Sequence, residues 1–297
     1  MPTIYHSNAN KPDDAAVVNL DSRQLTSVPT SLRTLSHLRS LSLYNNQLTT
    51  VPDWLWQFGA LEILNLSANQ ITTISSHIGA LARLRMLDLG HNALSQLPDS
   101  IGELAQLHFL YLSNNQLQAL PTTFTHLPNL RYLNLTHNRF INLSDSLGQL
   151  SHLTELRLYH NQLVSLPHTI GQLGHLIELH LMQNRLSTLP STIGRLQNLR
   201  LLDLQDNALT ALPTAIGILG CLTHLNLRNN RIAALPLSMG NLNSLRFLDL
   251  RNNQLTHLPE SMSSLPNLER LDLRWNQFST PPAWLTQLEQ RGCVIYL

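Results

Sequence analysis

The chain is short of charged residues. They make up 12% of its 297 residues, about half the share that is usual in globular proteins. Because 43% of the chain is hydrophobic, there is enough apolar material for a core, and disorder is not expected. The 19 basic and 18 acidic residues leave a net charge of +1, so no overall field draws the chain to nucleic acid or to an anionic membrane.

Cysteine and long apolar runs are also scarce. Only Cys221 and Cys293 are present, without the clustered cysteines that staple the ends of secreted repeat domains, which favours a reducing compartment. Residues 1–18 contain no apolar stretch of signal-peptide length, and no later segment reaches about twenty uninterrupted apolar residues. We therefore expect a cytoplasmic protein that neither spans nor binds a membrane.

Lysine is almost missing. Lys11 is the only one, and arginine supplies every other positive charge. Composition bias is the simpler explanation. The alternative is selection against lysine modification, which would suit a bacterial effector delivered into a host cell and acting on host proteins, because lysine is the residue that ubiquitin ligases tag.

Leucine, in contrast, recurs at a fixed 23-residue interval without insertion. With a weaker first copy at Ala15, twelve repeats run from 15 to 290, and the closing RGCVIYL predicts a thirteenth strand. This periodicity predicts an N-terminal tail over 1–14 and one repeat domain over 15–297. The leucines that set the interval are Leu38, Leu61, Leu84, Leu107, Leu130, Leu153, Leu176, Leu199, Leu222, Leu245 and Leu268.

One repeat, residues 84–106, reads LRMLDLGHNALSQLPDSIGELAQ. Leu87 and Leu89 are two residues apart, so on a strand both point into the core, while the residues between and around them face solvent. Asn92 then turns the chain inward, where its amide can satisfy backbone groups of the buried turn. Asn takes this position in eleven of twelve repeats, and the exception, Arg23, lies in the terminal repeat.

The second half of the repeat predicts a short helical or 3-10 segment. Pro98 is expected at its start, where a missing N–H costs little, and ten of twelve repeats have this proline. Ile101 and Leu104 are three residues apart and so share one side of the segment. Gly102 recurs beside the isoleucine in most repeats, which indicates crowding by a neighbouring repeat.

The strand motif L-x-x-L-x-L-x-x-N-x-L, joined by L-P-x-x-I-G-x-L, resembles the intracellular 23-residue class of leucine-rich repeat proteins, including Ras-pathway scaffold and plant Ras-group-related members. The resemblance covers residues 15–297. It implies an α/β fold: a right-handed horseshoe solenoid with a concave parallel sheet and convex short helices or 3-10 segments. It also implies a monomeric scaffold or adaptor for signalling or regulation, which binds a small GTPase, a phosphatase subunit, or an immune or host protein. No catalytic residue or cofactor is implied.

The exposed strand positions predict where a protein partner binds. Aromatic and arginine side chains, the usual anchors of interfaces, gather in successive repeats, although aromatic residues also suit strands for structural reasons alone. This first group comprises Phe109, Tyr111, Tyr132 and Tyr159, with Arg139, Arg157, His160, His180 and Arg185 beside them.

A second predicted surface lies toward the C-terminus. Its interleaved acids argue against nucleic acid, and lateral pairing between opposite charges on neighbouring strands is the structural alternative to partner binding. The group comprises Arg228, Arg231, Arg251, Arg270, Arg274 and Trp275, together with Asp249 and Asp272.

Histidine is abundant, with 14 residues, and raises a metal hypothesis. His137 and His160 occupy the same position one repeat apart, and His180 is also close. A zinc site needs three or four convergent ligands, and we expect neither cysteine nor a carboxylate cluster near these histidines. Glu155 and Glu178 also share a strand position, yet a solvated face gives no desolvation to separate their pKa values. The expectation is a protein without metal, cofactor or catalytic activity, in which both cysteines only pack.

Two further hypotheses concern the two ends of the repeat domain. The terminal strand CVIYL has a backbone edge that can pair with another copy, and Trp54 and Trp56 offer either a second binding face or a cover for the N-terminal end.

Overall fold

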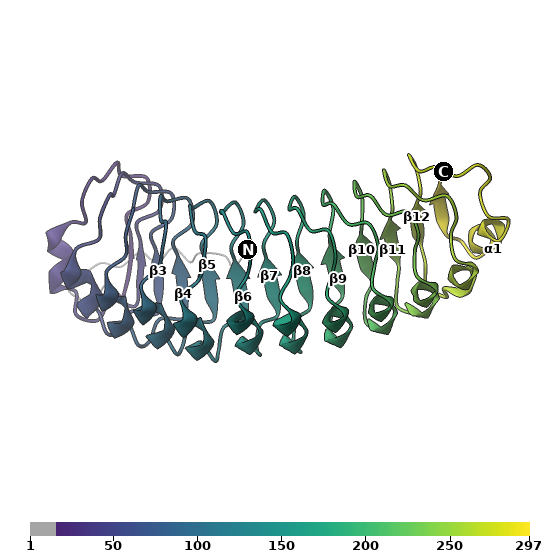
Figure 1. Cartoon of the computed structure of the whole chain (residues 1–297). Coiled ribbons are helices and arrows are strands. Elements are labelled where there is room, and N and C mark those ends of the chain that lie inside the picture. The colour runs from purple at the N-terminus through teal and green to yellow at the C-terminus, as the bar shows by residue number, and fades with distance from the viewer. Residues whose placement is uncertain (1–15) are drawn as a thin grey trace. The chain divides into compact units, whose positions relative to one another are not determined.

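The computed structural model describes residues 16–297, so Lys11, Ala15 and the predicted tail lie outside the described residues. The chain divides into two compact units, Met1–Leu130 and Arg131–Leu297, and each is described by itself. In both, three-residue parallel strands alternate with five-residue 3-10 helices (Figure 1). None of the helices in this part of the chain has the length and apolar composition needed to cross a membrane.

The described part of the first unit has five strands. Each pairs in parallel with the next, and the paired residues lie one repeat apart in the sequence, as Val17 and Ser40 do. The strands are β1 (Val17–Asn19), β2 (Ser40–Ser42), β3 (Ile63–Asn65), β4 (Met86–Asp88) and β5 (Phe109–Tyr111), and the 3-10 helices are η1 (Thr30–Thr34), η2 (Asp53–Gln57), η3 (Ser76–Ala80), η4 (Asp99–Glu103) and η5 (Thr122–His126).

The second unit continues the pattern with eight strands, and the predicted last strand is confirmed. Its final register step, from Asp272 to Tyr296, is one residue longer than the others, and an α-helix replaces the 3-10 helix there. The strands are β6 (Tyr132–Asn134), β7 (Glu155–Arg157), β8 (Glu178–His180), β9 (Leu201–Asp203), β10 (His224–Asn226), β11 (Phe247–Asp249), β12 (Arg270–Asp272) and β13 (Val294–Tyr296); the helices are η6 (Asp145–Gln149), η7 (His168–Gln172), η8 (Ser191–Arg195), η9 (Thr214–Ile218), η10 (Leu237–Asn241), η11 (Glu260–Ser264) and α1 (Leu285–Gln290).

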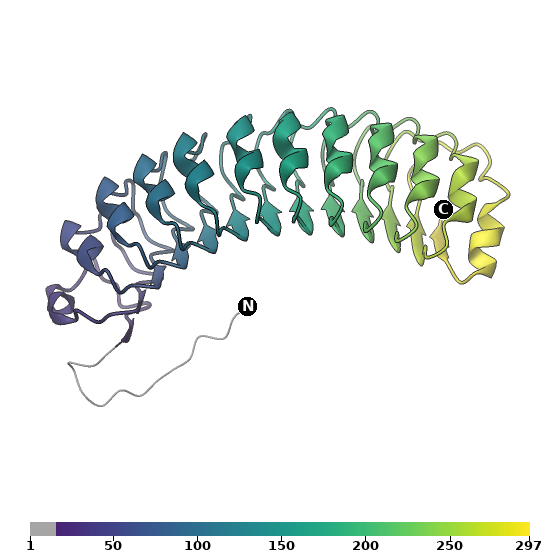
Figure 2. The same ribbon diagram turned by 90° about the horizontal axis from the view of Figure 1, so that it is seen from below.

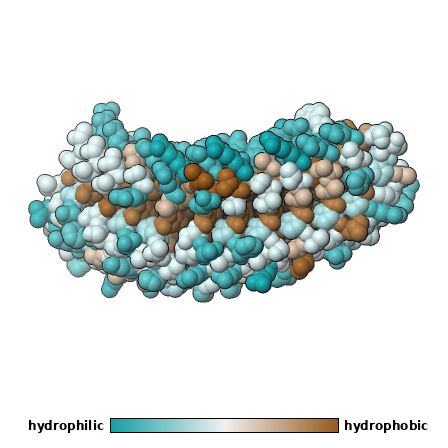
Figure 3. All heavy atoms as spheres, viewed as in Figure 1, coloured by the Kyte–Doolittle hydropathy of each residue, from teal (hydrophilic) through white to brown (hydrophobic). Residues whose placement is uncertain are grey.

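The leucines of each repeat form the core, as predicted. Leu87, Leu89 and Leu94 are fully buried, and the strands and helices of each unit lie on opposite sides of this core (Figure 2). The first and third residues of a strand therefore point away from the core and form the strand face. In the view of Figure 3, hydrophobic residues occur as small brown groups separated by hydrophilic ones.

Within each unit, a ladder of buried and half-buried asparagines ties successive repeats together. Asn115 accepts a hydrogen bond from the backbone N–H of Leu94 at 2.9 Å and donates to the carbonyl oxygens of Leu89 and Leu112 at 2.9 and 3.2 Å. Because one amide satisfies groups of two repeats, the predicted role of this asparagine is confirmed. At the terminal repeat the backbone N–H of Arg23 instead donates to Asn46.

The residue before each ladder asparagine has a left-handed backbone. Its φ lies between 52° and 60° in every repeat, a conformation that non-glycine residues adopt uncommonly and that Asn, Asp and His tolerate better than most. Side chains at this position stand at the end of the strand face. They belong to Asn45, Ala68, His91, Asn114, His137, His160, Gln183, Asp206, Asn229, Asn252 and Trp275.

The recurring glycines lie where neighbouring 3-10 helices approach closely and leave no room for a Cβ, as expected. A Cβ on Gly217 would lie 2.2 Å from the carbonyl oxygen of Ser238 in the next repeat. The predicted start of the helix is wrong by one residue, because Pro98 is the extended cap that precedes Asp99.

Two further expectations need correction. Cys221 is exposed and only Cys293 is buried, so packing explains one cysteine, and Cys293 lies just before β13. Trp56 is 1% exposed and cannot contact a partner, whereas Trp54 stays partly exposed and packs edge-on against Phe58.

Candidate partner-binding surface

The strand face of the second unit brings most of the predicted binding residues together in two groups. The first, the central cluster, is carried by β6, β7 and β8 and the turns that follow them. In each of these strands the middle leucine is buried and its two neighbours are partly exposed. The members of the central cluster are Tyr132, His137, Glu155, Arg157, Tyr159, His160, Glu178 and His180.

Arg157 organises the central cluster. Its Nε donates to Glu155 Oε1 at 2.5 Å, and its guanidinium lies over the ring of Tyr132, 5.6 Å from the centroid. Burial lowers the pKa of Arg157, but the hydrogen bond to Glu155 and the surrounding groups outweigh it, and the pKa is raised. The arginine is therefore a permanent cation held against an aromatic ring, an arrangement that limits its rotamers before a partner arrives.

His180 lies beside two carboxylates. Its Nε2 is 3.0 Å from Glu178 Oε2 and 3.9 Å from Glu155 Oε1, and only 14% of its side chain is exposed. These three side chains offer ligand atoms that all lie within 4.8 Å of one another. The expectation that carboxylates are absent near the histidines is thus wrong for His180. In this arrangement the imidazole forms a hydrogen bond with Glu178, and Arg157 donates to Glu155.

His137 and His160 stack as their repeat position predicts. Their ring centroids are 4.0 Å apart at an interplanar angle of 18°. Tyr159 meets both rings edge-on, with centroids 5.7 Å away in each case. The result is a small aromatic platform on the strand face, with polar edges and a large contact area, which suits protein recognition.

The first unit holds the other two predicted aromatic residues. Phe109 is 42% exposed and stacks against His108, whereas Tyr111 is half-buried. Tyr111 lines a shallow pocket of about 300 Å³ together with Asp88, whose pKa is raised mainly by burial.

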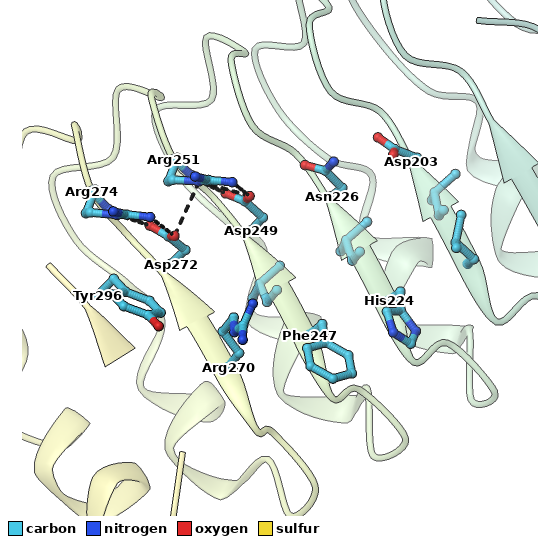
Figure 4. Close-up of a pocket in the computed structure, with 14 residues that line it drawn as sticks. Asp203, His224, Asn226, Phe247, Asp249, Arg251, Arg270, Asp272, Arg274 and Tyr296 are labelled. Atoms are coloured by element: carbon cyan, nitrogen blue, oxygen red, sulfur yellow. Dashed lines mark hydrogen bonds and ion pairs between the residues drawn. The ribbon is translucent and has the colours of Figure 1, made fainter. Parts of the chain in front are cut away.

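The second group of the second unit is a hollow of about 560 Å³, here called the C-terminal pocket. It lies over β9 to β13, with an apolar floor and a row of polar side chains along one side (Figure 4). Its lining residues are Leu201, Leu202, Asp203, His224, Leu225, Asn226, Phe247, Leu248, Asp249, Arg251, Arg270, Asp272, Arg274 and Tyr296.

Charges in the C-terminal pocket pair along and between strands. Arg251 follows β11 and binds Asp249 at the end of that strand. It also reaches Asp272 on β12, with 3.3 Å between Nε and Oδ2, so the lateral pairing expected from the sequence is present. Arg274 binds Asp272 at 2.6 Å. The hydrogen bonds to their aspartates raise the pKa of both arginines despite the opposing effect of burial.

Aromatic groups flank the last of these arginines. Arg274 lies 4.9 Å from the ring centroid of Tyr296 and 5.7 Å from that of Trp275. Trp275 is 63% exposed, the largest exposed aromatic surface among residues 16–297. The predicted combination of arginine and tryptophan at this end is therefore a single packed group.

Three predicted arginines stand apart from both groups. Arg139, Arg185 and Arg231 follow the ladder asparagine of their repeats, beyond the strand, and are exposed. Their nearness in sequence to residues of the strand face suggested that they belong to that face. In the structure, the turn at the asparagine places them beyond the end of the strand.

Comparison with known proteins agrees with this architecture. A family model described as leucine-rich repeat region matches residues 37–130, and one described as leucine rich repeat matches residues 118–163, 151–209, 174–232 and 221–278. A search of curated protein sequences finds no match.

Solved structures resemble the chain over most of its length. A leucine-rich repeat protein of Leptospira interrogans is 29% identical, with 96% of each chain covered and a TM-score of 0.51. The ectodomain of the Arabidopsis thaliana receptor kinase GASSHO1/SCHENGEN3, in complex with CASPARIAN STRIP INTEGRITY FACTOR 2, is 31% identical with a TM-score of 0.73; 95% of this chain and 38% of that one are covered. The chain thus spans well under half of that receptor structure.

A third structure, the Toll–Spatzle complex of Drosophila, is 26% identical with a TM-score of 0.76, and the match covers 95% of this chain and 42% of that one. Proteins of this fold are commonly protein-interaction modules without catalytic activity, and two of these three structures are complexes.

Proposed function

Because the chain belongs to the leucine-rich repeat family, we propose that it is a non-enzymatic scaffold or adaptor that holds a protein partner against its strand face. The observation that carries the proposal is the central cluster. Tyr132 on β6 and Arg157 on β7 stand at outward positions of neighbouring strands, and Tyr159 follows β7. The intervening leucines are fully buried. A surface that combines a fixed cation with aromatic rings is typical of interface anchors.

The proposed setting is intracellular signalling or regulation, in the cytoplasm and as a monomer. The even 23-residue spacing and the L-P-x-x-I-G-x-L segments support membership of the intracellular Ras-related class. The two cysteines are both free, which agrees with a reducing compartment. By this resemblance the partner is a small GTPase, a phosphatase subunit or an immune component. We further propose that residues 15–297 form one repeat domain, since the 23-residue period of the sequence continues unchanged past Leu130, where the first unit ends.

A bacterial effector is the second candidate, favoured by the single lysine among 19 basic residues. Such an effector would use the same strand face to bind a host protein. A ubiquitylation assay in eukaryotic cell extract separates the two settings. Resistance to tagging supports the effector, and efficient tagging removes its rationale.

A metal-dependent enzyme is the third hypothesis that the histidines raised. The residues to test are Glu155, Glu178 and His180 in addition to His137 and His160, since the former three converge. Metal analysis of the purified protein decides it, because a stoichiometric transition metal lost in His180→Ala would contradict the scaffold proposal.

The test of the leading proposal compares two variants in affinity capture followed by mass spectrometry. Tyr132→Ala/Tyr159→Ala removes the aromatic anchors of the central cluster, and we expect about ten-fold or greater loss of the partner. The matched control is Leu237→Ala, which removes a side chain that is 75% exposed on η10. Equal recovery with both folded variants would contradict binding at the central cluster.

A further inference from the structure

Aspartate occupies the same repeat position on three strands that line the C-terminal pocket, at Asp203 on β9, Asp249 on β11 and Asp272 on β12. Arginines hold the last two. Asp272 binds Arg274, two residues later, and also Arg251, which has the position of Arg274 in the preceding repeat. Figure 4 draws these ion pairs as dashed lines and shows Asp203 at the far end of the row without a dashed line.

Asp203 has no cation at either of the corresponding positions. The residue two positions later is Gln205, and the residue one repeat before Gln205 is Met182. The carboxylate accepts hydrogen bonds from the backbone N–H of Gln205, at 3.1 Å, and from the side chain of Asn226, but both donors are neutral. No ion pair within residues 16–297 reaches it, and Asp206 adds a second negative charge nearby. The β9 end of the pocket is therefore negatively charged.

The neighbouring imidazoles do not cancel this charge. His180 lies beside Asp203 on β8 and forms its hydrogen bond with Glu178. Burial lowers the pKa of His224 from its ordinary value, so this imidazole is mostly neutral at pH 7. Its ring stacks on Phe247, with 4.5 Å between the centroids. The middle of the pocket is thus an uncharged, largely apolar surface.

The other end of the pocket carries a positive charge. Arg270 on β12 is exposed, lines the pocket and forms no ion pair within the described part of the chain, because Asp249 and Asp272 already bind other arginines. From β9 to β12 there are three strand spacings, about 14 Å. An extended chain crosses this distance in about four residues.

We propose that the C-terminal pocket binds an extended segment of the protein partner, in which a lysine or arginine pairs with Asp203 and an acidic residue about four positions away pairs with Arg270. The side chains between these two residues pack on His224 and Phe247. This inference rests on the proposed function and adds the chemistry of the partner. Because charges of both signs are matched, the ion pairs also determine which end of the segment lies over β9.

Asp203 lowers the stability of the chain as long as no cation binds it. Its carboxylate is half-buried, and burial raises its pKa, so the charged form present at pH 7 destabilises the folded state. A cation that enters the pocket stabilises this charge, whereas Asp203→Asn removes the charge altogether. We therefore expect Asp203→Asn to raise stability and to weaken binding.

Variants at the two ends of the pocket test the assignment. Asp203→Asn and Arg270→Gln each remove one charge. Asp145→Asn and Arg139→Gln make the same changes in the same unit at exposed positions outside the pocket, and are the matched controls. Thermal unfolding of every variant is measured first, and Arg270→Gln, at an exposed position, decides the matter if Asp203→Asn is unfolded.

The probe is a phage-displayed library of random peptides of about twelve residues, selected on the full chain. We expect the selected peptides to share a basic and an acidic residue about four positions apart. Their affinity should fall about ten-fold or more in Asp203→Asn and in Arg270→Gln and stay unchanged in the two controls. Peptides without this pair of charges, or peptides that bind Asp203→Asn as well as the unaltered chain, overturn the inference.

A double-mutant cycle determines whether each contact is direct. Once the basic residue of a selected peptide is replaced by Gln, Asp203→Asn should cause little further loss of affinity. The acidic residue of the peptide and Arg270→Gln should behave in the same way. Additive losses in both cycles would mean that these residues do not contact the peptide charges, and would overturn the pairing.

The same peptides separate this inference from the proposed function. Peptides that lose affinity in Tyr132→Ala/Tyr159→Ala but not in Asp203→Asn or Arg270→Gln support the strand face as a binding surface and overturn only the role of the C-terminal pocket. A selection that yields no binder also overturns the role of the pocket, while the affinity capture described above tests the proposed function by itself.

Discussion

The side-chain amide of Asn253 donates a hydrogen bond of 2.9 Å to the carbonyl oxygen of Leu227, 26 residues earlier. The same amide donates to Leu250 and accepts from the N–H of Ile232 at 3.0 Å in each case. One side chain therefore satisfies backbone groups of two consecutive repeats, and its loss leaves several buried polar groups without partners.

We predict that Asn253→Ala lowers the free energy of unfolding by about 3 kcal/mol, since each buried unsatisfied group costs about 1–3 kcal/mol. The control is Asn243→Ala, at an exposed position, which should change stability by less than about 0.5 kcal/mol. Urea denaturation measures both. Similar effects of the two substitutions would mean that the ladder does not hold the repeats together.

A pair of glycines in one repeat tests the close packing of the 3-10 helices. Gly217→Ala would place a Cβ 2.2 Å from the backbone oxygen of Ser238, whereas a Cβ on Gly220 meets nothing within 4 Å. We expect Gly217→Ala to destabilise the protein by about 1–3 kcal/mol and Gly220→Ala to be neutral or slightly stabilising. Thermal unfolding of the two variants side by side provides the measurement, and a neutral Gly217→Ala would contradict the packing described.

The pKa of Asp203 is raised above 3.8, chiefly by burial. A carboxyl group whose pKa is higher in the folded than in the unfolded state lowers stability once the pH rises through these values, because folding then requires a charge to be desolvated. Asp203→Asn should therefore raise the melting temperature at pH 7, and the gain should vanish below the unfolded-state pKa.

Asp249→Asn provides the contrast in the same pocket. It removes a carboxylate that binds Arg251, so we expect a lower melting temperature at pH 7. If both substitutions shift stability in the same direction, the distinction between a desolvated carboxylate and a paired one is wrong.

The two cysteines should differ in reactivity. Burial raises the pKa of the Cys293 thiol to about 11, so only about 0.1% is thiolate at pH 8, and the thiolate is the reactive form. Cys221 is exposed. Iodoacetamide at pH 8 followed by peptide mass spectrometry should find Cys221 modified well before Cys293, and the reverse order would contradict the burial of Cys293.

The repeat architecture was predictable because its determinants are local and recur. Leu87 and Leu89 reveal a strand by their spacing, and Asn115 and Gly217 reveal a buried turn and a close contact because the same residue types return at these positions in repeat after repeat. Even the stacking of His137 on His160 follows from a shared repeat position, since parallel strands bring equivalent residues side by side.

The chemistry of the strand face was harder to predict because it depends on side-chain direction across several repeats. The sequence showed that Glu155 and Glu178 share a repeat position. It did not show that His180, two residues after Glu178, lies close to both carboxylates. The sequence also predicted the same role, partner binding, for Arg228 and Arg251. Only the pairing geometry reveals that Asn226, where the next repeats have aspartate, leaves the first of these arginines without an acceptor.

The central claim is that a protein partner lies against the strand face, and site-specific photocrosslinking tests it most directly. A photoreactive phenylalanine analogue replaces Tyr159 in one version of the chain and Leu237, exposed on η10, in another. After illumination in cell extract, we predict a discrete covalent protein adduct from the Tyr159 position and none of that mass from the Leu237 position. Adducts only from the Leu237 position would contradict the claim.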